Sequence, residues 1–310
     1  MRQSLISLTR WVVAGVLAGL ATGAIAQDHI GFLDANGTFS RIDVPGAPSD
    51  TFPRDINNAG QIVGYNCLGE GGACHKVHGF LDVGGTFTTI DVPGAPFTFP
   101  NGINNSGQIV GTAIASGIGT VGFLYAGGTF SLIAVPGASE TAAFGINDAG
   151  QIVGSFFALD ANTGFQREHA FLYSGGTFTT IEIPDDHAVG INNAGQIIGI
   201  RGLLDVNGTF TNIAVPGASP TFLYGINNTG QIVGTFEDSS GVHGFVYAGG
   251  TFSTIDLPLR TEAFGINDAG HIVGSTQSLP VPEPGSLVLF SIGLLGLGLA
   301  WRRRVAAHLY

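Results

Sequence analysis

The sequence predicts an all-β fold: a six-bladed β-propeller built from six four-stranded repeats, flanked by an N-terminal signal peptide and a C-terminal transmembrane helix. A single pattern recurs six times between residues 31 and 274, namely Gly-Thr-Phe after a tight turn and then Ile-Asn followed by Gly-x-Ile-(Val/Ile)-Gly. Each repeat contains two hairpin signals, which implies four short strands. Four strands in roughly 40 residues is the size of a propeller blade.

Residues 1–26 are expected to be a secretory signal peptide. Arg2 and Arg10 precede an apolar run from Trp11 to Ile25, and Ala24-Ile25-Ala26 is a small-x-small cleavage site. This order of charge, apolar segment and small residues is that of an export signal. A transmembrane anchor is the alternative, for which the run is short.

Residues 27–278 are expected to form the repeat domain. The Phe of Gly-Thr-Phe and the Ile of Ile-Asn keep step along the chain. The first set is Phe39, Phe87, Phe130, Phe178, Phe210 and Phe252, and the second is Ile56, Ile103, Ile146, Ile191, Ile226 and Ile266. Most of the length variation falls after Ile-Val-Gly, which marks a surface loop there.

The two turns of each repeat have different chemistry. Asn36-Gly37 and Gly84-Gly85 represent the first, and such pairs accept the positive φ angles of a type I′ turn. Asn147-Asp148-Ala149-Gly150 represents the second, a type I turn closed by a left-handed glycine. A β-solenoid is the alternative fold, although its coils are usually parallel strands without paired hairpin turns.

The sequence allows two ways of closing the ring. If each blade begins at the Ile-Asn strand, the first two strands of the chain complete the blade begun near Ile266. We favour this arrangement because it leaves fewer open sheet edges than blades that follow the repeat as written.

Cys67 and Cys74 are the only cysteines, and they flank a small loop in the first repeat. In an exported protein they are expected to form a disulfide. A metal site with His75 and His78 is the alternative, but its spacing differs from that of common zinc sites.

Three histidines begin the Gly-Phe-Leu strand of alternate repeats: His78, His169 and His243. If that strand were innermost, the three side chains would face one another across the axis and form a three-His metal site. The alternative is a local role at the strand entry, and we expect no metal or other cofactor.

The Asn of Ile-Asn recurs in all six repeats, which favours a structural role because a catalytic group is needed only once. A functional site, if the domain has one, is expected where the pattern is broken. Such places are Asp185-Asp186-His187, Arg167, Arg201 and the segment from Cys67 to His78. No familiar catalytic motif is present in the domain, so an enzyme is not expected.

The C-terminal region divides into three parts. Residues 279–285 are a linker that contains Val281-Pro282-Glu283-Pro284, residues 286–301 are a predicted transmembrane helix, and residues 302–310 are a basic cytoplasmic tail. The prolines end the sheet, and Arg302, Arg303 and Arg304 hold the end of the helix on the cytoplasmic side.

The charge of the repeat domain excludes some partners. All 22 acidic residues of the chain lie between Asp28 and Glu283, together with six of its basic residues, so this region carries 6 − 22 = −16. Nucleic acid and anionic membrane surfaces are therefore poor partners.

Pro282-Glu283-Pro284, the apolar run and Arg302 to Arg304 together resemble the PEP-CTERM sorting signal of exported Gram-negative bacterial proteins. The resemblance implies recognition and cleavage by an exosortase-type enzyme, in bacteria that make exopolysaccharide. The repeats, with His169-Ala170-Phe171, resemble the HAF extracellular repeat family.

From these features we expect an exported protein at the cell surface or in an exopolysaccharide matrix, first anchored in the inner membrane by its C-terminal helix. Its expected role is binding or structural, with exopolysaccharide as a candidate partner. The alternative is an extracellular polysaccharide lyase or hydrolase whose site joins several of the unrepeated polar residues.

Overall fold

A computed structural model of the chain describes residues 29–47, 50–68, 74–159, 164–183 and 186–277. These residues form strands and turns without any helix, so the all-β prediction is confirmed for them. The expected signal peptide, the sorting segment, the C-terminal helix and the basic tail lie outside the described residues. Within the described ranges there is no helix suited to crossing a membrane.

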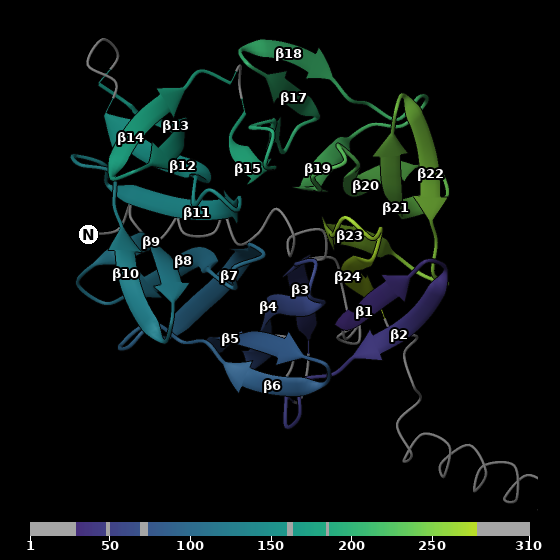
Figure 1. The fold of residues 1–310 in the computed structure, drawn as a ribbon, viewed down its shortest axis with the longest axis horizontal. Coiled ribbons are helices and arrows are strands. Elements are labelled where there is room, and N and C mark those ends of the chain that lie inside the picture. Colours follow the sequence, from purple (N-terminus) through teal and green to yellow (C-terminus); the bar gives the residue numbers. More distant parts are fainter. Residues whose placement is uncertain (1–28, 48–49, 69–73, 160–163, 184–185, 278–310) are drawn as a thin grey trace, which may run out of the picture. The chain divides into compact units, whose positions relative to one another are not determined.

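Each repeat supplies an inner strand that ends in Ile-Asn and a second strand that carries Ile-(Val/Ile)-Gly. The inner strands surround the centre of a ring (Figure 1). They are β3 (Thr51–Ile56), β7 (Phe97–Ile103), β11 (Glu140–Ile146), β15 (Ala188–Ile191), β19 (Thr221–Ile226) and β23 (Thr261–Ile266). The second strands are β4 (Gln61–Leu68), β8 (Ile109–Ala115), β12 (Ile152–Leu159), β16 (Ile197–Gly199), β20 (Ile232–Asp238) and β24 (Ile272–Gln277).

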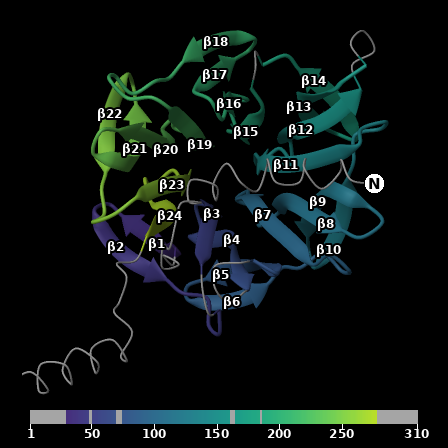
Figure 2. The same ribbon diagram turned by 180° about the vertical axis from the view of Figure 1, so that it is seen from behind.

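The third and outer strands complete the hairpins on the outside of the ring, as the view from behind also shows (Figure 2). The third strands are β1 (His29–Ala35), β5 (Lys76–Val83), β9 (Gly119–Ala126), β13 (Gln166–Ser174), β17 (Leu203–Val206) and β21 (Gly241–Ala248). The outer strands are β2 (Thr38–Ile42), β6 (Thr86–Thr89), β10 (Thr129–Ile133), β14 (Thr177–Ile181), β18 (Thr209–Asn212) and β22 (Thr251–Ile255).

The arrangement is a β-propeller, but the prediction of six separate four-stranded blades is wrong. Hydrogen bonding joins the strands into four separate four-stranded blades and one eight-stranded sheet that contains β3 to β10. The two repeats merge where Val77 of β5 pairs in parallel with Phe97 of β7, and Val77 N donates to Pro96 O over 3.2 Å. This bridge depends on how closely neighbouring repeats approach, which repeat spacing does not reveal.

The ring closes through its first and last strands, as the favoured arrangement predicts. β1 pairs antiparallel with β24 over six residue pairs, from His29 with Gln277 to Asp34 with Ile272. The closing blade therefore has the order β2, β1, β24, β23, and the chain's ends share one sheet. Both central strands of that blade are hydrogen-bonded on two sides, which leaves no open edge where the ends meet.

Both predicted turns are confirmed. Asn36 and Gly37 have φ angles of 56° and 88°, and Gly84 and Gly85 have 61° and 87°, as a type I′ turn requires. In the second turn, Gly150 N donates to Asn147 O over 3.0 Å and Gly150 has a φ of 74°. These turns return each strand beside its predecessor, which builds the antiparallel blades.

The hydrophobic core lies in the seams between successive repeats. One cluster joins Val110 of β8 and Ile133 of β10 to Ile146 of β11 and Phe171 of β13. The same arrangement closes the ring, where Ile42 of β2 and Val273 of β24 pack with Ile56 of β3. Burial of apolar area is thus shared between neighbouring repeats, and each repeat depends on the next for its core.

Candidate binding site at the centre of the ring

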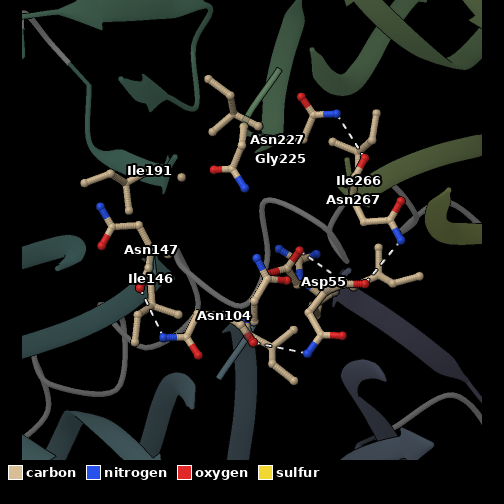
Figure 3. A pocket seen from close by; sticks show the side chains of 18 of the residues that line it. Asp55, Asn104, Ile146, Asn147, Ile191, Gly225, Asn227, Ile266 and Asn267 are labelled. Atoms are coloured by element: carbon tan, nitrogen blue, oxygen red, sulfur yellow. Dashed lines mark hydrogen bonds between the residues drawn. The ribbon is translucent and has the colours of Figure 1, made fainter. Parts of the chain in front are cut away.

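Six buried asparagines join the repeats into a closed hydrogen-bonded circle around the axis. The side-chain Nδ2 of Asn57 donates to the backbone oxygen of Asn104 over 3.1 Å, and the same bond repeats from each asparagine to the next. The circle closes where Asn267 Nδ2 donates to Asn57 O over 3.2 Å. Figure 3 shows Asn104, Asn147, Asn227 and Asn267 around the central opening. The members are Asn57, Asn104, Asn147, Asn192, Asn227 and Asn267.

Each of these asparagines also holds its own turn. Asn147 Oδ1 accepts from Gln151 N over 3.0 Å, and Asn147 Nδ2 donates to Gln151 Oε1 over 2.8 Å. The side chain therefore satisfies turn groups that would otherwise be buried without partners. This confirms the structural interpretation of the repeated Asn and adds the link between repeats, which the sequence pattern alone does not show.

The residue after each buried asparagine forms a second, exposed circle, called here the rim. Asn58 N donates to Asn105 Oδ1 over 2.8 Å, and Asp268 N closes the rim by donating to Asn58 Oδ1 over 2.9 Å. Around the rim, two asparagines are followed by one aspartate, and this order occurs twice. They are Asn58, Asn105, Asp148, Asn193, Asn228 and Asp268.

The two rim carboxylates are held by amides. Asp148 Oδ2 accepts from Asn193 Nδ2 over 2.6 Å and from Asn105 Nδ2 over 2.8 Å. Partial burial opposes ionisation of Asp148, but these hydrogen bonds outweigh it and lower the pKa of its carboxyl. Asp268 has the same arrangement with Asn228 and Asn58, and its pKa is also lowered. Both groups are therefore negative at neutral pH and already occupied by donors.

Inside the rim is a central cavity of about 80 Å³. Its wall includes the residue two positions before each Ile of Ile-Asn, a position that five different residue types occupy in the six repeats. The turns and strands are therefore similar in every repeat, whereas the side chains in this layer of the cavity vary. The layer consists of Arg54, Asn101, Phe144, Val189, Tyr224 and Phe264.

Arg54 is the one cation among the described residues that line this cavity. Its guanidinium carbon lies 4.3 Å from the centre of the Phe264 ring and 5.8 Å from that of Tyr224. Cation–π contacts of this kind hold a guanidinium by its face and leave its N–H groups available at the edge. The two aromatic rings are 5.3 Å apart in an edge-to-face arrangement, so they form a fixed support.

Asp55, next to Arg54, stands where the other five repeats have glycine. Glycine suits the position because the inner strands approach closely, and a Cβ on Gly265 would lie 2.6 Å from Asp55 Cα. The Asp55 carboxylate crosses to the next repeat, where Oδ2 accepts from Ile103 N over 2.9 Å. Desolvation of the carboxyl exceeds the effect of its hydrogen bonds with Ile103 and Ile56 and raises the pKa of Asp55 to about 7.

Asp55 is expected to make the protein less stable as pH rises. Because its folded-state pKa lies above the unfolded value, the folded state binds the proton more tightly, and stability falls between about pH 4 and pH 7. Urea unfolding at several pH values should show a steeper decline for the native protein than for Asp55→Gly. Comparing the two cancels the contribution of Glu168, whose pKa is also raised to about 7. Equal pH dependence would contradict this assignment.

The structure does not bring His78, His169 and His243 together. They lie on the third strands β5, β13 and β21, while the inner strands line the axis. His78 Nδ1 pairs with Asp91 Oδ2, and His243 Nδ1 pairs with Asp256 Oδ1 over 2.7 Å. The His169 ring stacks on Phe156 with centroids 5.3 Å apart. Within the described ranges, no three His, Cys, Asp or Glu side chains are grouped to hold a metal.

Some unrepeated polar residues do meet between β13 and β15. His187 Nδ1 lies 3.4 Å from Glu168 Oε1, and Asp186 Oδ2 accepts from Arg201 N over 2.8 Å. Burial raises the pKa of Glu168 to about 7 and lowers that of His187 to about 4. Asp185 lies outside the described residues, and the Cys67 to His78 segment belongs to another repeat.

Cys67 and Cys74 form the predicted disulfide, with Cα atoms 5.4 Å apart. The bond closes the loop between β4 and β5. With both sulfurs bonded to each other, the alternative metal site with His75 and His78 lacks its thiolate ligands.

Arg54 and Asp55 were not identified as site residues from the sequence. A signal was present, because aligning the six Ile-Asn positions shows that only the first repeat has Asp in place of Gly and only the first has a cation before it. This difference points to a site only once the inner strands are known to line the cavity.

Comparison with known families concerns the C-terminal segment. Residues 280–304 match the PEP-CTERM protein-sorting motif. The match includes Val281 to Pro284 and Arg302 to Arg304, so this part of the resemblance is confirmed. The motif implies an exported protein directed to the cell surface and processed by an exosortase. It spans the C-terminal segment alone, and no curated protein matches the chain.

Solved structures resemble the fold at low sequence identity. A protein described as a TolB of Agrobacterium tumefaciens has 12% identity and a TM-score of 0.59, over 83% of this chain and all of its own. TolB of Acinetobacter baumannii has 11% identity and a TM-score of 0.49, over 83% of this chain and 65% of its own. The Aleuria aurantia lectin has 14% identity and a TM-score of 0.40, over 75% of this chain and 97% of its own. At these identities the first likeness shows a shared fold, and the other two support no argument.

Proposed function

We propose that this chain is an exported binding protein of the cell surface or extracellular matrix, whose ligand site is the central cavity of its propeller. The observation that carries the proposal is the sorting motif at residues 280–304, which implies export. The cavity supports a binding role because its inner layer varies while the scaffold around it repeats. We further propose that the domain is not an enzyme, that the repeats belong to the HAF type, and that a C-terminal helix anchors the protein before processing.

The sorting step is testable at residue level. Replacing Pro282, Glu283 and Pro284 by alanine should prevent exosortase cleavage and leave the C-terminal segment on the exported protein. Intact-mass measurement of protein recovered from the cell envelope and medium reports this directly. The native chain should lack residues 287–304, whereas the variant should retain them.

Ser131→Ala, on an exposed strand position, is the matched control and should be processed like the native chain. Retention of residues 287–304 in the native protein would contradict processing, and processing of the triple variant would contradict the role of the motif.

The alternative function is an extracellular polysaccharide-acting enzyme, and the Glu168–His187 pair is the observation that favours it. A carboxyl with a raised pKa beside a neutral imidazole suits general acid–base chemistry. Acidic and neutral polysaccharides incubated with the protein should release reducing ends or unsaturated products if this is correct, and Glu168→Gln should abolish the release. Absence of turnover with both kinds of substrate would favour the binding role.

A further inference from the structure

Arg54 presents hydrogen-bond donors in the central cavity that the described residues do not use. Its guanidinium is held against Phe264 and Tyr224, and it forms no hydrogen bond or ion pair with any described residue. A guanidinium has five N–H donors in a planar fork. A guanidinium that is held against aromatic rings and lines a cavity suits a ligand.

The carboxylates around Arg54 are committed elsewhere. Asp55 accepts from two backbone N–H groups, those of Ile56 and Ile103, each over 2.9 Å. Glu262 accepts from Arg260 Nη2 over 2.8 Å and from Ser275 Oγ over 3.3 Å. The rim aspartates are bound by asparagine amides, as described above. Arg54 and Asp55 attract each other electrostatically, but none of these acids forms a hydrogen bond with the Arg54 fork.

We propose that the cavity binds the carboxylate of a uronic acid, with Arg54 as its bidentate partner. The planar carboxylate matches the guanidinium fork better than a spherical ion does. The aromatic side chains of Phe144 and Tyr224 also line the cavity, so the fork lies among apolar groups that exclude water from the carboxylate contact. The rim amides lie at the opening, where each retains an N–H for a sugar hydroxyl.

The cavity size favours partial entry of the ligand. Its volume of about 80 Å³ exceeds the roughly 30 Å³ that one water occupies in the liquid. It is well below the roughly 300 Å³ of sites that enclose a whole small molecule. A carboxylate therefore enters while its sugar ring remains at the rim.

The test measures binding of D-glucuronate, D-glucose, acetate and sulfate to the native protein by titration calorimetry. Glucuronate should bind more tightly than acetate or sulfate, and glucose should not bind. Arg54→Gln should weaken glucuronate binding about 10-fold or more, since a charge-assisted bidentate contact is lost. Arg54→Lys should also bind more weakly because it keeps the charge without the fork. Arg41→Gln, a change in an exposed Arg paired with Asp43, is the control and should bind normally.

Unchanged glucuronate affinity in Arg54→Gln would overturn the inference, as would equal affinity for sulfate or for glucose. Circular dichroism of each variant identifies folding failure, and Arg54→Lys retains the test if the glutamine variant does not fold. The inference rests on the proposed binding function. Absence of glucuronate binding by the native protein, together with normal C-terminal processing, would overturn the ligand assignment alone, whereas failure of export and processing would overturn the proposed function.

Discussion

Gly154→Ala is expected to lower the free energy of unfolding by about 3 kcal/mol or more, at the upper end of the usual cost of overpacking a core. Gly154 lies in the middle of β12, where a Cβ would collide with the backbone oxygen of Ala142 on β11. It would also lie 2.8 Å from the buried ring of Phe171. Neither neighbour can move easily, because one is backbone and the other fills the seam core.

Urea unfolding followed by circular dichroism measures this loss. Ser131→Ala on β10 adds no atoms and lies on the surface, so it should change stability by less than about 0.5 kcal/mol. A Gly154→Ala protein as stable as this control would show that the strands can separate to admit a methyl group, contrary to the packing described.

Asn147→Ala is expected to destabilise the protein by about 3 kcal/mol, because buried groups on two repeats lose their partners together. The change leaves Gln151 N without its acceptor in the turn and Asn192 O without its donor in the next repeat. Asn147→Asp should cost at least as much as the alanine variant, because a buried carboxylate oxygen would face the acceptors Asn192 O and Gln151 Oε1.

Unfolding of Asn105→Ala provides the comparison, since the side chain of this rim residue accepts from Asn58 N and donates to Asp148 Oδ2 in an exposed position. Its cost should stay below about 1 kcal/mol because water replaces the lost partners. If Asn147→Ala cost no more than Asn105→Ala, the buried circle would not contribute to stability as proposed here.

Local chemistry accounts for what the sequence could predict. Asn-Gly and Gly-Gly pairs determine the type I′ turns. The spacing between repeated residues such as Phe39 and Ile56 then indicates where the strands of each repeat lie along the chain. The pairing of β1 with β24 was also favoured by the sequence. If the first two and the last two strands of the chain did not join, each would leave an open sheet edge. These features depend on a few neighbouring residues, or on the need to hydrogen-bond the strands at the edges of a sheet.

Features that depend on contact between repeats could not be predicted. The Val77–Phe97 bridge merges two repeats into one sheet, although nothing in either repeat's pattern marks it. The pattern also does not show why Ile-Val-Gly ends in glycine, since Gly154 lies within a strand beneath Phe171. The position of Arg54 in the cavity likewise required knowing which strand is innermost. Each of these follows from distances between strands in the folded ring, which a linear pattern does not contain.

The closing blade determines how the domain would bear mechanical load. β24 ends at Gln277, directly before the segment that leads to the sorting motif, and it is hydrogen-bonded to β23 on one side and to β1 on the other. A pull on the C-terminal tether would therefore act along two ladders at once. Such loading shears many bonds together, whereas an edge strand would unzip bond by bond. A force applied at the end of β24 would thus have to break both ladders before the ring could open.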